Sequence, residues 1–260
     1  MMRRRALLAI ITVMSAALPA VAGEIGNAAR RSGYEFMSSD TKAMQDDDTA
    51  NPAMLSVLDG ETLWTTKAGV ANKACSDCHG DAAVSMKGVA ARYPAFDAIS
   101  GAPVDLGQRV NLCRKQHQQA DPFAPDSREM LALTALIAKQ SRGTPIAAGD
   151  DPRLASAVAH GRDLFMQRQG QLNLACTNCH DDNSDKHLAG SAITQGQPTG
   201  YPIYRLEWQG MGSLQRRIRG CMTGVRAQAF DFDTPDMIAL ELYLMSRAHG
   251  MPMDAPAVRP

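Results

Sequence analysis

The chain has 260 residues, of which 45% are hydrophobic, 5% are aromatic and 21% are charged. Its 27 basic and 27 acidic side chains give a formal net charge of zero at pH 7. The lack of excess positive charge and the scarcity of aromatic rings argue against a nucleic-acid-binding surface, and the length suffices for two domains of roughly 100 residues.

The first 22 residues have the features of a secretory signal peptide. Arginines at positions 3 to 5 precede an apolar run that reaches Leu18, and the small residues Ala20-Val21-Ala22 follow. The apolar run is too short to cross a bilayer, and no later segment approaches the roughly 18 consecutive apolar residues that a membrane helix needs. We therefore expect a Sec-type signal peptide that is cleaved after Ala22, export to the periplasm, and a mature protein without a membrane span.

Residues 23–50 are polar and show no sustained apolar period. We interpret them as an N-terminal arm that wraps or links, and their acidic cluster Asp46-Asp47-Asp48 as solvated charge. A first domain is expected over 51–147 and a second over 148–260, because the stretch 141–152 between them is rich in glycine and proline.

The first domain contains the motif Cys75-Ser76-Asp77-Cys78-His79, which recurs 101 residues later as Cys176-Thr177-Asn178-Cys179-His180. This spacing is typical of covalent haem attachment, because the two thiols add to the vinyl groups of haem c and the adjacent imidazole binds the iron. We therefore predict two covalently bound haem c groups, with His79 and His180 as proximal ligands. A zinc site would need four well-spaced ligands per metal, which makes haem the better interpretation.

Whole domains are repeated, not the motifs alone. The segment Gly60-Glu61-Thr62-Leu63-Trp64 matches Gly161-Arg162-Asp163-Leu164-Phe165 at the same offset of 101 residues. No alternating β-branched run of useful length appears in either half. The sequence therefore predicts a mainly α fold, built from two tandem cytochrome c-like haem domains related by duplication.

Both domains are expected to finish with an amphipathic helix. Asp126-Ser127-Arg128-Glu129 has the pattern of a capping box, and Thr234-Pro235 has the pattern of a threonine N-cap followed by proline at the first helical position. Apolar residues at helical spacing follow both starts. We expect Gly143 and Gly250 to end these helices.

Each domain has one further cysteine, Cys113 in the first and Cys221 in the second. Methionine is the usual sixth ligand of cytochrome iron, but none of the conceivable candidates repeats between the domains: Met86, Met130, Met211 and Met222. We therefore predict Cys113 and Cys221 as the distal iron ligands, with His117 in reserve. A disulfide between the two cysteines, or two inert buried thiols, is the structural alternative. Thiolate ligands would lower the haem potential, which suggests sulfur chemistry.

Arginines gather around the second of these cysteines, within five residues of it: Arg216, Arg217, Arg219 and Arg226. The planar guanidinium group binds tetrahedral oxyanions through paired hydrogen bonds. If the stretch is helical, Arg217 shares the face of Cys221, and we predict it as the substrate-binding residue. Arg109 stands at the matching place before Cys113, so a haem propionate is the other possible partner for this position.

These residues resemble the family of dihaem A subunits of the SoxAX cytochromes, the L-cysteine S-thiosulfotransferases. The resemblance spans nearly all of the mature chain, and the stretches that carry it are 44–52, 198–208, 213–217, 221–226 and 239–244. It implies that both haems have His and Cys ligands and that Cys221 is the active-site thiol, which carries an extra sulfur as a persulfide in relatives. It also implies that Arg217 holds thiosulfate.

The resemblance further implies that thiosulfate is joined oxidatively to a cysteine on the swinging arm of a sulfur-carrier protein of the SoxYZ type, while two electrons leave through haem. The implied partners are a monohaem cytochrome c of the SoxX type, bound as a heterodimer, and a small cytochrome c that accepts the electrons. Two alternatives stay open. One is a dihaem cytochrome that only transfers electrons, and the other is a thiosulfate dehydrogenase that forms tetrathionate without a carrier.

Overall fold

The computed structural model describes residues 25–260, so the predicted signal peptide and its cleavage site lie outside it. The fold is mainly α, as predicted. Its α-helices are α1 (Ser39–Asp46), α2 (Ala53–Thr65), α3 (Ser76–His79), α4 (Ala82–Ser85), α5 (Leu106–Cys113), α6 (Arg128–Lys139), α7 (Ala155–Met166), α8 (Cys176–His180), α9 (Leu214–Gly224) and α10 (Pro235–Arg247). Its strands are short: β1 (Ala95–Asp97), β2 (Ala102–Val104), β3 (His187–Leu188), β4 (Ser191–Ala192), β5 (Ile203–Arg205), β6 (Gly210–Gly212) and β7 (Ala257–Arg259).

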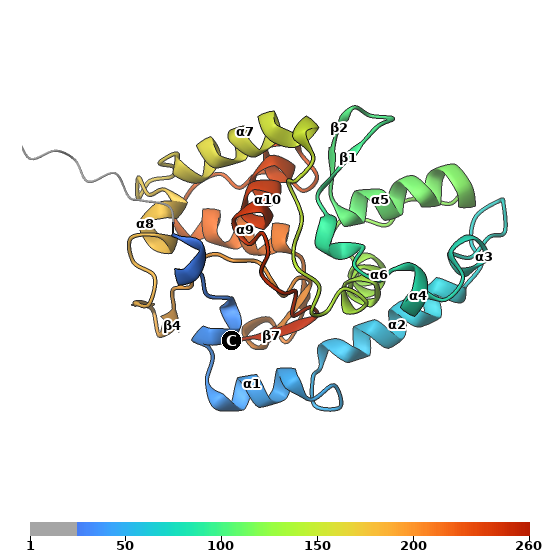
Figure 1. Cartoon of the computed structure of the whole chain (residues 1–260), viewed down its shortest axis with the longest axis horizontal. Coiled ribbons are helices and arrows are strands. Elements are labelled where there is room, and N and C mark those ends of the chain that lie inside the picture. Colours follow the sequence, from blue (N-terminus) through green and yellow to red (C-terminus); the bar gives the residue numbers. More distant parts are fainter. Residues whose placement is uncertain (1–24) are drawn as a thin grey trace, which may run out of the picture.

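Two helical units lie side by side, and each is built on one crossed pair of helices (Figure 1). In the first unit α2 packs against α6, and in the second α7 packs against α10. A glycine stands at each crossing, because a Cβ atom on Gly60 would collide with the carbonyl of Ala132, and one on Gly161 with the carbonyl of Ala239. The repeated glycine of the sequence therefore sets the closest approach of the main helix pair in both units.

The helices that end both units differ slightly from the sequence expectation. Thr234 caps α10 as predicted and accepts a hydrogen bond from the backbone of Met237. The predicted capping box at the start of α6 is wrong, because Ser127 is the N-cap and Asp126 instead has a φ of 58°. Both helices end three or four residues before Gly143 and Gly250, each of which has a φ of 78°.

A second pair of helices is also duplicated. α5 starts at the N-cap Asp105 and α9 at the N-cap Ser213, and each side chain accepts the backbone N–H three residues on. These helices carry Cys113 and Cys221 respectively. The Asp126 carboxylate of the first unit accepts a hydrogen bond from the backbone N–H of Ser213 at 2.8 Å, so a group from one unit supports the helix start of the other.

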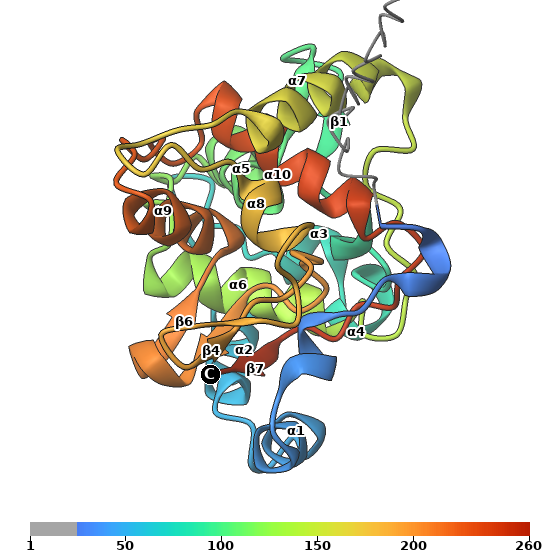
Figure 2. The same cartoon turned by 90° about the vertical axis from the view of Figure 1, so that its left-hand side faces the viewer.

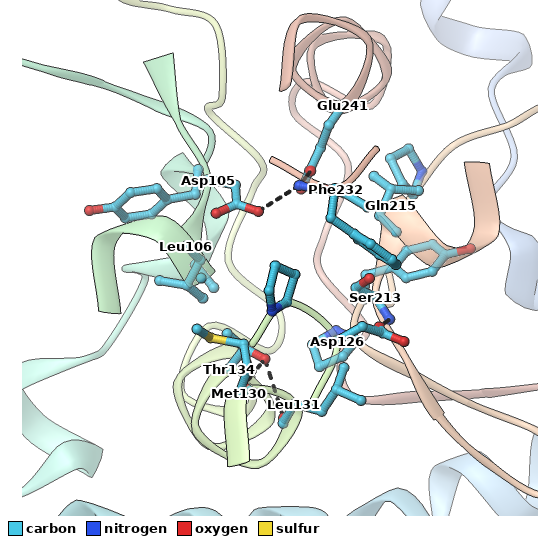
Figure 3. Close-up of a pocket in the computed structure, with 18 of the residues that line it drawn as sticks. Asp105, Leu106, Asp126, Met130, Leu131, Thr134, Ser213, Gln215, Phe232 and Glu241 are labelled. Carbon is cyan, nitrogen blue, oxygen red and sulfur yellow. Dashed lines mark hydrogen bonds between the residues drawn. The ribbon is translucent and has the colours of Figure 1, made fainter. Parts of the chain in front are cut away.

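A cavity of about 100 Å³ lies where the two units meet, and Figure 3 shows the polar groups that line it. The side-chain amide of Gln215 donates to Asp105 at 2.8 Å and to Glu241 at 3.0 Å. Burial raises the pKa of Asp105 to about 7 and raises the pKa of Glu241 as well. The boundary between the units therefore contains half-buried carboxyl groups that compete for one amide.

The second unit contains a three-stranded sheet in the order β6-β5-β7. β5 is central, pairs antiparallel with β6 and parallel with β7, and ends at Arg205, which lies opposite Gly210 and Arg259. A central strand has backbone partners on both sides, so its position is well fixed. Arg205 is thereby held on a rigid element.

The segment that precedes the first unit lies against the second unit, where it appears blue in Figure 2. The Arg30 guanidinium donates to the backbone carbonyl of Arg247 at 2.8 Å, and the amide of Gln195 donates to the carbonyl of Ala29 at 3.0 Å. α1 contacts β7, and the Gln45 side chain accepts the N–H of Val258 at 3.1 Å. No helix within residues 25–260 has the length and apolar character to cross a membrane.

Candidate functional site

The two Cys-x-x-Cys-His motifs each form one helical turn, α3 and α8. The middle residue of each motif folds back on the chain. The Asp77 carboxylate accepts the N–H of Ala74 at 2.9 Å, and the Asn178 carbonyl oxygen accepts the N–H of Ala175 at 3.0 Å. All six cysteines of the chain are unpaired, so Cys113 is not bridged to Cys221.

His180 is held in one orientation. Its Nδ1–H donates to the carbonyl of Thr194 at 2.7 Å, which leaves Nε2 as the ring nitrogen that can bind a metal. Gly196, with a φ of 68°, packs against the imidazole, and a Cβ atom there would lie 3.3 Å from the ring. The ring of Phe165 stacks with the imidazole at 6.4 Å between centroids. These contacts are those expected of a proximal iron ligand.

Cys221 on α9 faces His180. Burial acts to raise the pKa of the thiol, but the hydrogen-bonding imidazole and then the charges of Arg217 and Arg205 act more strongly and lower the pKa to about 7. Burial acts to lower the pKa of His180, whereas Cys221 and the carbonyl of Thr194 raise it. A thiol with this pKa is partly ionised at neutral pH, and the thiolate is the form that binds metals and attacks sulfur.

The matching thiol of the first unit has a different environment. Burial raises the pKa of Cys113, although the charge of Arg109 opposes this effect. Cys113 lies within electrostatic reach of the motif thiols Cys75 and Cys78, as Cys221 does of its own motif thiols. His79 lies 5.7 Å from the ring of Trp64 between centroids. Each unit therefore brings its later cysteine to its own haem motif.

The residues of both motifs fit a covalently bound haem. Free thiols stand one helical turn apart beside a histidine, and in the second unit a thiol faces that histidine as a second axial ligand would. Within residues 25–260, no group of three or more His, Cys, Asp or Glu side chains is arranged to hold a metal ion.

Arg217 and Arg109 occupy the same place on α9 and α5, but their partners differ. Arg109 donates to the Asp97 carboxylate at 2.7 Å, and the Asp97 side chain is 3% exposed. Arg217 acts on the pKa of Cys221 through its charge. Its side chain makes no hydrogen bond or ion pair with any residue in the described part of the chain. The second unit therefore presents an unpaired guanidinium beside a thiol.

The other residues considered from the sequence lie elsewhere. Met86, Met130 and Met222 are buried in the core, and His117 is exposed. The other histidines outside the two motifs, His160, His187 and His249, are exposed too. His160 and His249 pair with surface carboxylates. Two of the clustered arginines turn away from Cys221, because Arg216 bonds the carbonyl of Met211 and Arg219 that of Phe230.

Two residues of the site were missed by the sequence reasoning, Arg205 and Tyr201. Arg205 is 7% exposed, and its charge lowers the pKa values of both Cys221 and Tyr201. Burial nevertheless raises the pKa of Tyr201 to about 12. Both residues lie in the stretch 198–208 that carries part of the family resemblance, but no spacing rule connects this stretch to Cys221.

Comparison with known proteins identifies the fold and the family. The sequence profile described as "SoxA/TsdA, cytochrome c domain" matches residues 59–146 and 160–253, so the tandem units are cytochrome c domains and the chain is a protein with covalently bound haem c. The crystal structure of SoxXA from P. pantotrophus contains a chain that superposes with a TM-score of 0.86 at 34% identity, over 89% of this chain and 87% of that one.

Proteins named "L-cysteine S-thiosulfotransferase subunit SoxA" are similar over most of their length. The protein from Pseudaminobacter salicylatoxidans is 39% identical and that from Rhodovulum sulfidophilum 35% identical, each over 88% of this chain and 80% of the relative. The protein from Paracoccus pantotrophus is 34% identical over 88% of this chain and 78% of the relative. The chain therefore belongs to the SoxA family of L-cysteine S-thiosulfotransferase subunits.

Proposed function

We propose that this chain is the thiosulfate-binding subunit of an L-cysteine S-thiosulfotransferase and that Cys221 and Arg217 form its active site. The chain would carry two haem c groups, attached through Cys75 and Cys78 in a domain over 51–147 and through Cys176 and Cys179 in a domain over 148–260. An arm over 23–50 precedes them, and residues 1–22 would direct the protein to the periplasm and be removed.

The observation that carries this proposal is the unpaired guanidinium of Arg217 beside Cys221. In the first unit the equivalent Arg109 is neutralised by a buried aspartate at 2.7 Å. Arg217 has no such partner among residues 25–260, so its charge and its planar fork are available to an oxyanion. Only the second unit therefore combines a thiol with an anion-binding group.

The proposed reaction forms one sulfur–sulfur bond. The sulfane sulfur of thiosulfate joins the cysteine sulfur of a carrier protein, the thiol proton is released, and two electrons leave. Haem, when bound, supplies a one-electron redox centre through which these electrons can pass. His180 and Cys221 would bind the second iron, and His79 and Cys113 the first.

The residues of the chain hold and orient the reactants. Arg217 would bind the sulfonate oxygens of thiosulfate, which directs the sulfane sulfur toward Cys221. In a relay, the thiolate of Cys221 would form a sulfur–sulfur bond with the sulfane sulfur as two electrons leave, and the carrier thiolate would then attack that sulfane sulfur and release the Cys221 thiolate, so the net change is one new sulfur–sulfur bond. The low pKa of this thiol, about 7, suits that role, because the reactive form in sulfur exchange is the thiolate.

The proposed partners follow from the family. The similar solved structure is a SoxXA complex, which supports a monohaem cytochrome c of the SoxX type as a heterodimer partner for this chain. A SoxYZ-type carrier with a cysteine on a swinging arm would accept the sulfur group, and a small cytochrome c would accept the electrons.

Replacement of Cys221 tests the proposal. Cys221→Ser and Cys221→Ala should abolish conjugation of thiosulfate to the carrier while both haems stay covalently attached, as judged by mass spectrometry and the pyridine haemochrome spectrum. Thr223→Ala is a matched control, because Thr223 is exposed on the same helix and its hydroxyl only bonds the carbonyl of Arg219. Retained turnover in either Cys221 variant would refute the role of this thiol.

Product analysis separates the proposed reaction from its alternative. With thiosulfate, an electron acceptor and the carrier present, the carrier mass should rise by one thiosulfonate group. Without the carrier no tetrathionate should accumulate. Tetrathionate formed at an undiminished rate would identify the protein as a thiosulfate dehydrogenase instead.

A further inference from the structure

The duplication of the two units extends to the residues around the unpaired Arg217. The hairpin β1–β2 of the first unit corresponds to the pair β5–β6 of the second at an offset of 108 residues. Each follows a Tyr-Pro pair, Tyr93-Pro94 in the first unit and Tyr201-Pro202 in the second. The same offset relates the helix caps Asp105 and Ser213. The equivalence is therefore residue by residue over this region.

By this equivalence Asp97, the last residue of β1, corresponds to Arg205, the last residue of β5. In the first unit Asp97 accepts a hydrogen bond from Arg109 at 2.7 Å and another from the backbone of Ser100 at 2.8 Å. Asp97 is buried, Arg109 is half-buried, and the pair is electrically neutral. In the second unit the carboxylate is replaced by a guanidinium, so Arg217 faces a positive charge where Arg109 faces a negative one.

The second unit offsets this extra charge only through one exposed carboxylate. Arg205 is 7% exposed, and the like charge of Arg217 is felt at its side chain. Its Nη2 pairs with Glu207 at 2.6 Å, but the Glu207 side chain is 63% exposed. The Nε of Arg205 is buried and has no hydrogen-bond partner among the described residues. The site thus has two guanidinium groups and one unsatisfied N–H donor, but only one carboxylate beside them in the described part of the chain, and that carboxylate is exposed to solvent.

A buried charge whose counter-charge lies in solvent is unfavourable unless a further opposite charge offsets it. We propose that Arg205 is a second anion-binding residue of the Cys221 site, and that Arg205 and Arg217 together bind one doubly charged tetrahedral oxyanion, thiosulfate in the proposed reaction. This inference rests on the proposed function and adds a residue that sets specificity for a dianion. The exchange of Asp97 for Arg205 converts an internal ion pair into a receptor for an external anion.

The neighbours of Arg205 hold its guanidinium in place. It lies over the ring of Trp208 at 5.3 Å, and its backbone sits in the central strand of the sheet. Arg216 covers the same ring at 4.3 Å. A guanidinium fixed in this way loses little freedom when it binds an anion.

The experiment restores in the second unit the pairing of the first. Arg205→Asp places a carboxylate where Asp97 stands, and it should pair with Arg217 as Asp97 pairs with Arg109. Thiosulfate affinity is measured by isothermal titration calorimetry on the haem-loaded heterodimer without carrier protein, and KM by turnover with carrier. We expect the Kd and KM of Arg205→Asp to rise by at least about tenfold, because one binding group is lost and the other neutralised.

Two further substitutions and one control keep the test decisive. Arg205→Lys retains the charge but not the planar fork, and Arg205→Gln removes the charge, so thiosulfate Kd should increase in the order parent, Lys, Gln. If Arg205→Asp is not recovered with haem, the thiosulfate Kd values of Arg205→Lys and Arg205→Gln supply the test. Arg219→Gln removes the same charge from α9, but Arg219 bonds the carbonyl of Phe230 and pairs with Asp231. It should change the Kd by less than about twofold.

A haem propionate is also an oxyanion, and the readouts distinguish it from the substrate. If Arg205→Asp and Arg205→Gln shift the haem absorption spectrum and reduction potential but leave the thiosulfate Kd within about twofold of the parent, Arg205 binds a propionate and the inference is wrong.

The Arg217→Gln variant separates this inference from the proposed function, and its thiosulfate Kd is measured alongside. If it weakens thiosulfate binding while the Arg205 variants do not, the proposed function stands and only this inference fails. If Arg217→Gln has no effect either, the proposed role of Arg217 fails as well.

Discussion

The side-chain amide of Gln215 donates a hydrogen bond to the Asp105 carboxylate at 2.8 Å, across the boundary between the two cytochrome domains (Figure 3). Glu241 accepts from the same nitrogen at 3.0 Å, and Asp233 lies at 3.5 Å from it. One amide nitrogen has two N–H groups, so it cannot donate to all three of these half-buried carboxylates at once. Protons must therefore be shared within this cluster.

Stability should consequently fall as pH rises. Burial raises the folded-state pKa of Asp105 to about 7, and that of Glu241 above its usual range. The folded protein thus holds protons that the unfolded chain would release, and this contribution is fully present below about pH 4 and lost as pH rises through about 7. Thermal unfolding followed by circular dichroism from pH 4 to 8 should show this slope.

Asp105→Asn should flatten the slope, whereas Asp163→Asn should not, because Asp163 is exposed on α7. A parent protein whose Tm increases steadily from pH 4 to 8 would contradict the assignment.

Gly161→Ala should be severely destabilising. The added Cβ would meet the backbone carbonyl of Ala239 and the Cβ of Tyr243, so α7 and α10 would have to separate. Overpacking of this kind costs about 1–3 kcal/mol or more, and the yield of haem-loaded protein should drop. Gly220→Ala is the control, since no atom lies within 4 Å of the added Cβ and alanine is the better helix former there. Its denaturation midpoint should stay the same or rise.

Arg109→Gln and Arg217→Gln should have opposite phenotypes. Loss of Arg109 leaves the buried Asp97 without its ion pair, which should lower the free energy of unfolding by about 2 kcal/mol and leave the thiosulfate KM unchanged. Loss of Arg217 breaks no internal pair, so stability should hold while the KM rises. Urea titration and steady-state kinetics on both variants measure the difference. Equal effects of the two substitutions on KM would show that the units are not functionally distinct.

Ser213→Ala should weaken the start of α9. The Ser213 hydroxyl accepts the N–H of Arg216 at 3.1 Å, and loss of such an N-cap costs about 1 kcal/mol. Because α9 carries both Arg217 and Cys221, kcat/KM should fall together with the Tm. Ser213→Asp should restore both quantities, since aspartate is an equally good N-cap and Asp105 has this role in the first unit.

Local chemistry made much of the fold predictable from the sequence. The mainly α class, the duplicated units and the cap at Thr234 are confirmed, because they depend on short-range patterns. The capping box at Asp126 was wrong for a long-range reason. The Asp126 carboxylate accepts the backbone N–H of Ser213 in the other unit, so the neighbouring Ser127 caps α6 instead.

The site was only partly within reach of the sequence. Cys221 and Arg217 stand four residues apart on one helix, so periodicity relates them directly. Arg205 comes from a three-residue strand, which is too short for an alternating pattern to be recognised. The sequence does contain a signal for Arg205, because an arginine stands there where the first unit has Asp97. That match appears only at an offset of 108 residues, whereas the haem motifs repeat at an offset of 101. The assigned roles of these residues stay predictions.

The contacts of the N-terminal arm impose an order on assembly. The Gln45 side chain binds the backbone of Val258, so a segment synthesised near the beginning of the chain joins one made at its very end. The first helical unit can collapse before β7 has emerged and formed. The segment around Gln45 can therefore dock only after the strand that carries Val258 is in place.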